Sequence, residues 1–457
     1  MGIHNNNVFK LLYDYSKKKP DFIFIENEEE KYTISEFLST VCRTCNKLVD
    51  NGVKRGDIVE ILCKKDIETI IYFFACQVLG CVALMVGSQE EPSMLESEFN
   101  LDVKYRVFEN REVEKSKYLP MLQFDDIYDS KMTTILISTS GSTGQKKLVK
   151  LSQYAFINNS YDSEEFGNYE ESDVALAFLP MNHVFAIAML FTAICFQFKV
   201  VVSKTSETLH LLDYIEKYHV TRFNAVPSLL LKMVELNHHD VSSLKCAYIG
   251  GAPCSANDYL KIEKELGIKL ISVYGMSECI GISSGAYTDN SLVLAKTVGR
   301  KYSLNEIKIA SDGEIMVKSP SMCNGYIGGE LSTKNGYLLT GDIGKFDEKG
   351  YLHIIGRKKE IIIRNGLNIS IPEITKRLDE LELFKDFVVV GIDDSEVGEA
   401  PALAVVLNKD IEQKDINLEL SKYLKTYEMP SKVLCLDAIP LLENGKVDKQ
   451  TIRKMFA

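Results

Sequence analysis

The most informative segment of the chain reads Ile135-Leu136-Ile137-Ser138-Thr139-Ser140-Gly141-Ser142-Thr143-Gly144-Gln145-Lys146-Lys147. It begins as an apolar, β-branched run, which is typical of a buried strand, and it ends as a loop of hydroxyls, glycines and lysines. Glycines let backbone N–H groups approach phosphate oxygens, hydroxyls donate to the same oxygens, and lysine offsets their charge. The segment therefore predicts a strand that leads into a phosphate-binding loop, with a plain surface loop as the alternative.

This loop does not have the Walker A pattern. Only Ser142 and Thr143 separate Gly141 from Gly144, whereas a Walker A loop has a wider gap between its glycines, followed by Lys-Ser or Lys-Thr. The spacing therefore argues against a Walker-type ATPase.

Short β-rich runs alternate with amphipathic helical stretches on both sides of this segment. The expected strands are residues 58–62, 82–86, 105–108, 134–138 and 200–202. The expected helices include residues 34–50 and 210–218. Such alternation is typical of mostly parallel sheets flanked by helices, so we expect an α/β fold.

The later part of the chain has a different pattern. Shorter expected strands with turn signals, at residues 306–309, 314–318 and 351–354, indicate an antiparallel or barrel-like subdomain. A new cycle then begins, with expected strands at 360–363, 387–392, 402–407 and 432–436 and expected helices at 372–382 and 417–424. We therefore predict a large N-terminal domain, residues 1–357, of stacked βαβ sheets plus the barrel-like subdomain. A small mobile α+β C-terminal domain is predicted over residues 358–457.

Composition and charge exclude several classes of protein. The 457 residues are 46% apolar and 26% charged, which is ordinary for a globular chain and excludes a disordered or fibrous one. With 53 Lys+Arg against 64 Asp+Glu, the net charge is 53 − 64 = −11, so the chain offers no general basic field to nucleic acid. We expect no nucleic-acid partner.

Targeting and membrane segments are not expected. The N-terminus, Met1-Gly2-Ile3-His4, lacks a signal-peptide pattern, so we expect a cytoplasmic protein whose eleven cysteines are reduced. Cys42 and Cys45 form a CxxC within a helical pattern and lack a second ligand pair, so we expect ordinary helix cysteines. The apolar runs 69–87 and 185–198 raise the question of a membrane span. Because Gly80 divides the first run into a helix and a strand, we expect both runs to be buried core.

Four further motifs follow the glycine-rich loop in order. Tyr274-Gly275-Met276-Ser277-Glu278 comes directly after an expected strand at 269–273, which places an aromatic ring and a carboxylate at a strand end. Thr340-Gly341-Asp342 is expected in a turn. Gly356-Arg357-Lys358-Lys359 opens the small domain, and Asn444-Gly445-Lys446-Val447-Asp448-Lys449 closes it. Each motif alone has a plain explanation as a turn, a surface ion pair or a basic tail, so the information lies in their order and spacing.

Together these motifs resemble the adenylate-forming superfamily, which includes acyl-CoA synthetases, peptide-synthetase adenylation domains and firefly luciferase. The resemblance covers nearly the whole chain. Residues 139–147 are similar to the phosphate loop of the family, with Lys146 at the usual proline, and residues 274–278 are similar to its Tyr-Gly-x-Thr-Glu motif, with Ser277 for threonine. The segments 340–342 and 356–357 match without change. Residues 364–374 resemble the segment after the hinge, with Pro372 one place late, and residues 440–446 resemble the C-terminal lysine motif.

The resemblance implies a reaction in two steps. A carboxylate attacks the α-phosphorus of ATP to give an acyl-adenylate and pyrophosphate, and a thiol then displaces AMP. The implied cofactors and substrates are ATP, Mg²⁺ and coenzyme A, or the phosphopantetheine arm of a carrier protein in place of coenzyme A.

The resemblance also implies roles for individual residues. Those implied to bind ATP or AMP are Thr139, Ser140, Gly141, Ser142, Thr143, Gly144, Lys147, Gly250, Gly251, Ala252, Pro253, Tyr274, Gly275, Ser277, Asp342 and Arg357. Among these, Tyr274 would stack on adenine, Asp342 would accept hydrogen bonds from both ribose hydroxyls, and Arg357 would contact ribose or phosphate. Thr143 and Glu278 would help to place Mg²⁺.

The implied catalytic residues are Glu278, His183 and Lys446. Lys446 would bridge the carboxylate and the α-phosphate, because a long cationic side chain on the mobile domain can reach both. Lys359 would be the hinge about which the small domain rotates, and Gly366 would then be presented to the thiol tunnel.

The acid is only partly defined by the sequence. Amino-acid-activating relatives bind the α-amino group through an aspartate in a Phe-Asp motif, and the corresponding segment, residues 179–186, contains no aspartate. It resembles acyl- and aryl-acid ligases, in which a histidine, here His183, lies near the junction of carboxylate and thiol tunnel; a packed histidine is the plain alternative. Val184 replaces the asparagine typical of siderophore aryl-acid enzymes. We therefore predict an acid–thiol ligase for an aliphatic or aryl acid, with carrier-protein loading and a non-catalytic scaffold as alternatives.

Overall fold

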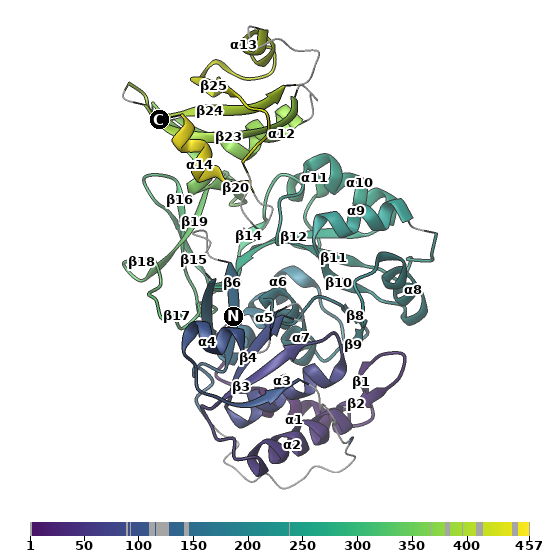
Figure 1. Ribbon diagram of the computed structural model, residues 1–457. Coiled ribbons are helices and arrows are strands. Elements are labelled where there is room, and N and C mark those ends of the chain that lie inside the picture. Colours follow the sequence, from purple (N-terminus) through teal and green to yellow (C-terminus); the bar gives the residue numbers. More distant parts are fainter. Residues whose placement is uncertain are drawn as a thin grey trace. The chain divides into compact units, whose positions relative to one another are not determined.

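A computed structural model describes residues 2–87, 90–91, 93–108, 115, 128–140, 146–236, 238–365, 367–379, 384–394, 396–407, 415–440 and 447–456 (Figure 1). The chain divides into two compact units. The first consists of Met1–Ile307, Val317–Leu338 and Phe346–His353, and the second of Lys308–Met316, Leu339–Lys345 and Ile354–Ala457.

Two sheets form most of the first unit. The larger has the order β14 (Arg300–Lys301), β13 (Cys279–Ser284), β12 (Lys269–Met276), β11 (Cys246–Ile249), β10 (Arg222–Ala225), β8 (Val174–Ala177), β9 (Lys199–Val202), β1 (Ile23–Glu26) and β2 (Lys31–Thr33). The smaller has the order β17 (Tyr326–Ile327), β7 (Lys146–Leu151), β6 (Ile135–Ser140), β4 (Val82–Gly87), β3 (Ile58–Cys63) and β5 (Val103–Val107). The central strand pairs of both sheets are parallel, and antiparallel pairs occur at their edges. The expected α/β fold is confirmed.

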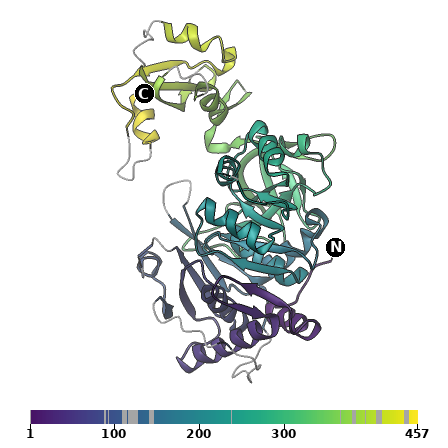
Figure 2. The ribbon, with the colours of Figure 1, turned by 90° about the vertical axis from the view of Figure 1, so that its right-hand side faces the viewer.

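Helices lie between the two sheets and on their outer faces (Figure 2). The inner core takes residues from α1 (Val8–Lys18), α2 (Ile34–Asp50), α3 (Ile67–Leu79), α5 (Gln153–Asp162) and α7 (Val184–Phe196). On the outer faces, α8 (Thr208–Tyr218), α9 (Pro227–Leu236) and α10 (Ala256–Leu266) cover the larger sheet, and α4 (Met94–Phe99) covers the smaller one. Successive residues of β9 therefore face opposite sides of the sheet. Val200 and Val202 belong to the inner core, whereas Val201 packs under α8.

The first apolar run divides as expected. Helix α3 ends at Leu79, Gly80 adopts a left-handed conformation with φ +78° as the helix C-cap, and β4 begins at Val82. A residue with a β-carbon would be strained in that conformation, so the glycine fixes the change from helix to strand. The second run forms α7, whose residues are largely buried. Among the described residues, no helix has both the length and the apolar character needed to cross a membrane.

Cys42 and Cys45 both lie within α2, as expected, and both are buried. Burial raises the pKa of the Cys45 thiol well above its usual value. The thiol therefore stays protonated, which is the state of a core residue and not of a metal ligand.

Two further five-stranded sheets follow in sequence. The first, in the part of the chain where a barrel-like subdomain is expected, has the order β15 (Glu306–Ile309), β16 (Glu314–Lys318), β19 (Tyr337–Phe346) and β18 (Thr333–Lys334), with β20 (Leu352–Arg357) beside β19. The second has the order β22 (Leu367–Ser370), β21 (Ile361–Arg364), β24 (Gly398–Leu407) and β23 (Phe384–Asp394), with β25 (Lys432–Cys435) beside β24. It is accompanied by the helices α12 (Ile371–Asp379), α13 (Ile416–Leu420) and α14 (Lys449–Met455).

These elements confirm the expected small α+β domain. The expected strand at 360–363 starts one residue late, because residues 358–360 form a 3₁₀ turn before β21. The chain boundary between residues 357 and 358 stays a prediction.

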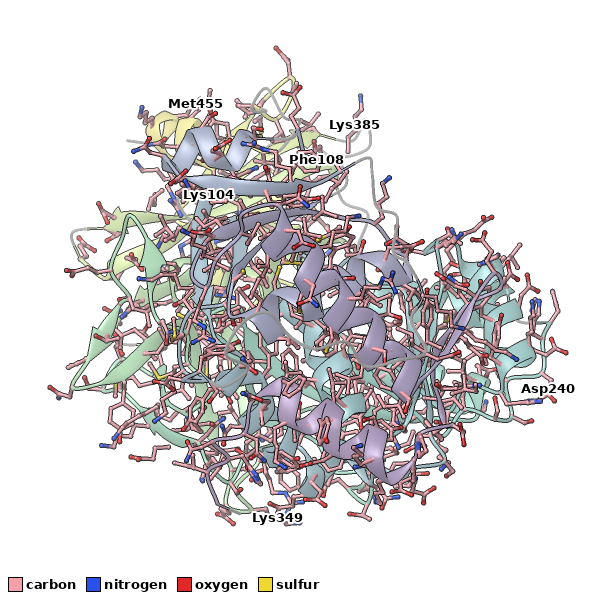
Figure 3. The ribbon with its side chains drawn as sticks, turned by 90° about the horizontal axis from the view of Figure 1, so that it is seen from below. Lys104, Phe108, Asp240, Lys349, Lys385 and Met455 are labelled. Atoms are coloured by element: carbon pink, nitrogen blue, oxygen red, sulfur yellow. The ribbon has the colours of Figure 1, made fainter. Side chains whose placement is uncertain are left out.

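On the first unit, charged side chains such as Lys104, Asp240 and Lys349 extend outward from the ribbon (Figure 3).

Candidate active site

The strands on either side of the glycine-rich loop form an antiparallel pair. In this pair Thr139 lies opposite Lys147, and Ser140 lies opposite Lys146. Residues Gly141, Ser142, Thr143 and Gly144 lie outside the described residues, as does the side chain of Ser140. Two of the seven loop residues implied to bind ATP or AMP, Thr139 and Lys147, are therefore neighbours across one ladder.

Lys146, which departs from the family pattern, has a specific partner. Its Nζ lies 2.7 Å from Oε1 of Glu90, and Oε2 of the same carboxylate accepts a hydrogen bond of 2.8 Å from the N–H of Gly87. The pair thus links the start of β7 to the end of β4. An ion pair here gives this lysine a structural role that a proline could not have.

Glu278 lies close to a tyrosine that the sequence motifs did not single out. The hydroxyl of Tyr326 donates to Oε1 of Glu278 at 2.5 Å, and Nζ of Lys147 lies 4.7 Å from the centre of the Tyr326 ring. Tyr326 belongs to β17, which pairs with β7. The structure therefore brings together Lys147 and Glu278, two predicted site residues, around one ring.

The strand before Glu278 is longer than expected. β12 continues through Met276, so Tyr274 and Gly275 lie within it, and Ser277 and Glu278 form the turn to β13. Tyr274 packs against a cluster of buried residues that includes Cys279. The next residue, Gly275, faces the opposite side of the strand, where it lines a pocket. A β-carbon at Gly275 would lie 2.0 Å from the carbonyl oxygen of Ile280, so only glycine fits this crossing of backbones.

A second group of predicted residues meets within the second unit. Nε of Arg357 lies 2.7 Å from Oδ1 of Asp342, and the Asp342 side chain is only 5% exposed. Thr340-Gly341-Asp342 does not form the expected turn, because it lies inside the long strand β19. Gly341 has φ +73°, and its N–H donates to Glu314. Residues that are typical of turns therefore produce a kink within the strand at this position.

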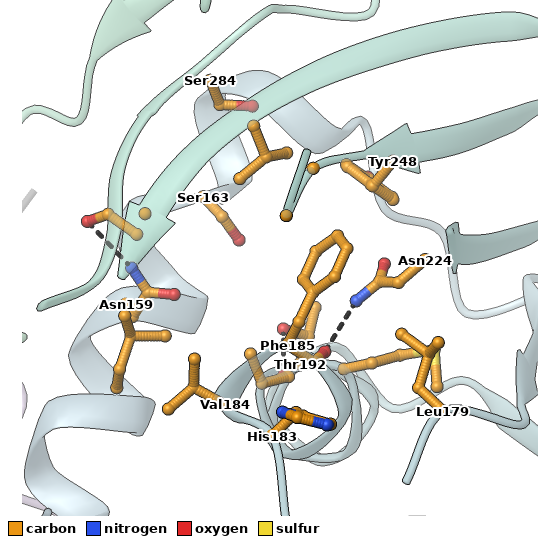
Figure 4. Close-up of a pocket in the computed structure, with 18 of the residues that line it drawn as sticks. Asn159, Ser163, Leu179, His183, Val184, Phe185, Thr192, Asn224, Tyr248 and Ser284 are labelled. Carbon is orange, nitrogen blue, oxygen red and sulfur yellow. Dashed lines mark hydrogen bonds between the residues drawn. The ribbon is translucent and has the colours of Figure 1, made fainter. Parts of the chain in front are cut away.

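One cavity of about 410 Å³ lies in the first unit (Figure 4). Of the predicted site residues, it is lined by His183, Gly250, Gly251, Gly275 and Ser277. Ala252 and Pro253 follow in the same bend after β11 but are exposed and do not line it. Apolar side chains, among them Leu179, Phe185 and Met189, form much of the remaining wall.

His183 stands immediately before α7, at the edge of this pocket. Desolvation by the surrounding protein lowers the pKa of its imidazole, and the nearby Glu90 carboxylate opposes that shift. The lowered pKa keeps the ring uncharged at neutral pH. A neutral imidazole beside a reacting carboxylate can accept or donate a hydrogen bond without drawing the anion into an ion pair.

The pocket also contains an arginine that the sequence motifs did not indicate. Arg222 of β10 lines the cavity with Tyr169, Tyr248 and Ser163, and its guanidinium is paired with Asp173. A weak sequence signal existed, since Arg222 is the single charged residue of the short run from Val220 to Val226. Its partner, however, lies 49 positions away and could not be recognised from spacing.

Several predicted site residues are not tested by these contacts. Lys446 and Gly366 lie outside the described residues, as does the side chain of the predicted hinge residue Lys359. The placement of Thr143, the second predicted ligand of Mg²⁺, is likewise outside that range.

Comparison with known proteins gives concordant matches. The family model described as AMP-binding enzyme matches residues 12–97 and 89–327, and the model described as AMP-binding enzyme C-terminal domain matches residues 376–446. A 2-succinylbenzoate–CoA ligase of Bacillus mycoides is 28% identical over 95% of this chain and 96% of its own length. The enzyme of the same name from Listeria monocytogenes is 25% identical over 96% of this chain and 97% of its own.

Solved structures show the same fold. ATP-bound MatB from Rhodopseudomonas palustris has a TM-score of 0.82 at 21% identity and covers 99% of both chains. The o-succinylbenzoate CoA synthetase of Bacillus subtilis in complex with its acyl-adenylate has a TM-score of 0.81 at 24% identity and covers 98% of both chains. The order of motifs, the fold and the family models agree, and the chain belongs to the AMP-binding enzyme family.

Proposed function

We propose that this protein is an ATP-dependent acid–thiol ligase, which activates an aliphatic or aryl carboxylic acid as acyl-AMP and transfers the acyl group to coenzyme A. The observation that carries the proposal is the 410 Å³ pocket, because residues from three separate segments implied by the family motifs, His183, Gly250–Gly251 and Gly275–Ser277, line one cavity. Its volume is within the range of about 300–1,000 Å³ that is typical of small-ligand sites.

The first step joins two anions, so the site has to neutralise charge. Lys147 beside the phosphate-loop strands and Lys446 of the C-terminal motif would supply that charge, with Lys446 between the carboxylate and the α-phosphate. Tyr274 would stack on adenine. In the second unit Asp342 would accept the ribose hydroxyls while Arg357, already within 2.7 Å of it, would contact ribose or phosphate.

Mg²⁺ fits the residues implied to hold it. Glu278 offers a carboxylate and Thr143 a hydroxyl, which are hard oxygen donors, and phosphate oxygens would complete the shell. Tyr326 holds one oxygen of Glu278 at 2.5 Å and so orients the carboxylate. Bound there, the ion would stabilise negative charge on the leaving pyrophosphate.

Coenzyme A is proposed as the thiol acceptor because the curated relatives named above are CoA ligases. A carrier-protein phosphopantetheine is the competing acceptor. After adenylation, the small domain, residues 358–457, would rotate about Lys359 and bring Gly366 to the thiol tunnel. A cytoplasmic location stays part of this proposal.

Acid-dependent exchange between ATP and labelled pyrophosphate tests the proposal. A panel of aliphatic and aryl acids, with 2-succinylbenzoate included because the relatives are named for it, should contain at least one acid that supports exchange without any thiol. Coenzyme A and a holo carrier protein are then compared as acceptors. Absence of exchange with every acid would favour the non-catalytic scaffold, and thioester on the carrier alone would replace coenzyme A as acceptor.

Lys446→Ala tests the role given to the C-terminal lysine. Adenylate formation should be abolished, whereas thioester formation from a supplied acyl-adenylate should be largely retained, because Lys446 acts only in the first step. Equal loss in both half-reactions would remove Lys446 from that role.

A further inference from the structure

A cluster of buried polar side chains lines the end of the pocket that is remote from His183. Ser163 and Tyr248 lie at the opposite side of the cavity from His183 (Figure 4), and Arg222 and Tyr169 line the cavity beside them. These four residues, Ser163, Tyr169, Arg222 and Tyr248, are called the distal cluster. An apolar pocket that served only hydrocarbon substrates would gain nothing from such a group, since burying polar atoms costs free energy.

One N–H donor of Arg222 has no acceptor among the described residues. Nη1 donates to the carbonyl of Gly167 at 3.1 Å and to the hydroxyl of Tyr248 at 2.9 Å, while Nη2 donates to the carbonyl of Asn168 at 3.2 Å and to Asp173. These bonds use the four N–H groups of the two terminal nitrogens. Nε has no acceptor among the residues that the structure describes, although the Arg222 side chain is only 4% exposed.

Contacts on several sides restrain the guanidinium of Arg222. Its partner Asp173 is fully buried and is itself held by the hydroxyl of Thr221 at 2.9 Å and by Nζ of Lys245 at 3.2 Å. The guanidinium also stacks 4.8 Å from the centre of the Tyr169 ring. These contacts hold the guanidinium of Arg222 in place in the wall of the pocket.

The hydroxyls around Arg222 add polar surface at the same end. The hydroxyl of Tyr169 lies 3.1 Å from Oγ of Ser163, and that of Tyr248 lies 3.3 Å from the carbonyl oxygen of Gly167. Burial raises the pKa of both tyrosines, so both hydroxyls stay protonated. The distal cluster is thus rich in donors, and within the described part of the chain Nε–H is the one that has no acceptor.

We propose that the acid taken by this pocket carries an oxygen acceptor, such as a carbonyl, a hydroxyl or a second carboxylate, at the end remote from the reacting carboxyl, and that Arg222 Nε–H binds it. The proposal rests on the acid–thiol ligase function. It makes Arg222 a specificity-determining residue, because a hydrocarbon-ended acid would leave a buried donor unpaired. A site built to hydrogen-bond its substrate rejects the analogue that lacks the partner group.

Matched acids of equal length test the proposal on the unmodified protein. Each pair has the same skeleton and differs only in whether the remote position is a CH₂ or methyl group, or instead a carbonyl, hydroxyl or carboxylate. The polar member should have kcat/KM in acid-dependent pyrophosphate exchange roughly tenfold or more above its hydrocarbon partner. Comparison of the keto, hydroxy and dicarboxylic members then identifies the acceptor. Equal or better activity with the hydrocarbon members would overturn the proposal.

A pair of variants assigns that preference to Arg222. Arg222→Met alone would strand the buried Asp173, so the test variant is Arg222→Met with Asp173→Asn, and the control is Asp173→Asn, which keeps the Nε–H donor. Because Asp173→Asn also removes the counter-charge of the buried Arg222, both variants are assayed at a temperature at which their unfolding curves show them folded. The ratio of kcat/KM between polar and hydrocarbon acids should fall toward one in the double variant and persist in the control. Persistence of the ratio in a folded double variant would overturn the assignment. Failure of every acid in the unmodified protein would instead contradict the ligase function itself.

Discussion

Two arginine–aspartate pairs in this protein have the same chemistry and opposite surroundings. In the first unit, Arg222 and Asp173 are 4% and 0% exposed, and carbonyls, a hydroxyl and a lysine surround them. In the second unit, Arg357 is 58% exposed and its partner Asp342 is 5% exposed. The first pair is almost completely buried in the wall of the pocket, whereas the second has one side chain in water.

The difference in burial implies a difference in task. A buried pair is costly to break, because removal of one member leaves a charge without solvent or partner, so it suits a fixed wall. An exposed guanidinium gains little from its ion pair and can exchange it for a ligand. We therefore expect Arg222 to be part of the fixed wall of the proposed acid pocket, and we expect Arg357 to change partner if it contacts nucleotide as proposed.

The largest expected effect is on stability, at the buried pair. Asp173→Ala leaves the Arg222 guanidinium without its counter-charge and should lower the free energy of unfolding by about 3–5 kcal/mol. Arg357→Ala is the matched comparison and should cost clearly less, because solvent reaches this pair through the 58% exposed Arg357 side chain. Urea unfolding of the full-length variants measures both, and equal losses would contradict the division of tasks.

The second effect is on rate, at the exposed pair. Arg357→Ala should lower acid-dependent pyrophosphate exchange roughly 10²-fold, the size typical for loss of one positioned donor, while the protein stays folded. Steady-state exchange with a thermal unfolding curve on the same preparation checks the result. Normal exchange by the variant would remove Arg357 from the nucleotide site.

A pair of intermediate burial gives a pH-dependent effect. Arg377 forms two bonds to Glu428, of 2.7 and 2.9 Å; although burial alone would raise the pKa of Glu428, the Arg377 hydrogen bonds leave it lowered. A lowered folded pKa contributes stability above the unfolded value near 4.3, and that stability is lost as pH falls through the folded pKa.

Arg377→Met should therefore change the acid limb of the stability curve. Without the guanidinium, burial raises the pKa of Glu428. As the pH falls through the acid range, the free energy of unfolding of Arg377→Met should therefore decrease less steeply than that of the unmodified chain. Unfolding curves between pH 3 and 7, with Glu428→Gln as the control, test this. Identical acid limbs in the unmodified protein and Arg377→Met would contradict the pKa assignment.

The smallest effect is expected at the Lys146–Glu90 pair, whose side chains are 31% and 18% exposed. Lys146→Ala should cost less than about 1 kcal/mol, because a partly solvated pair contributes little. Denaturant titration measures the change. A loss as large as that of Asp173→Ala would show that partial exposure does not weaken this pair.

Much of the fold could be predicted because its signals are local. The strands at 58–62 and 82–86 and the split at Gly80 depend on side-chain pattern and on one glycine with φ +78°. The β1–β2 hairpin and β17 were not predicted, since strands of four, three and two residues are too short to show a period.

The site residues also divide into those with a local sequence signal and those without one. Lys147, Glu278, Asp342 and Arg357 belong to contiguous motifs and could be recognised, whereas Tyr326 and Arg222 acquire their roles from residues distant in the chain. The expected turn at Thr340–Asp342 was wrong because Gly341 provides a kink within β19, and residue type alone does not distinguish the two uses.

The fate of a carboxylate oxygen tests the proposed chemistry most directly. An acid that supports exchange is prepared with ¹⁸O in its carboxylate and incubated with the protein, ATP, Mg²⁺ and coenzyme A, and the nucleotide products are examined by mass spectrometry. Because the carboxylate attacks the α-phosphorus and the thiol then displaces AMP, one ¹⁸O should appear in AMP for each acyl-CoA formed. Formation of ADP, or of AMP that carries no ¹⁸O, would contradict an acyl-adenylate intermediate.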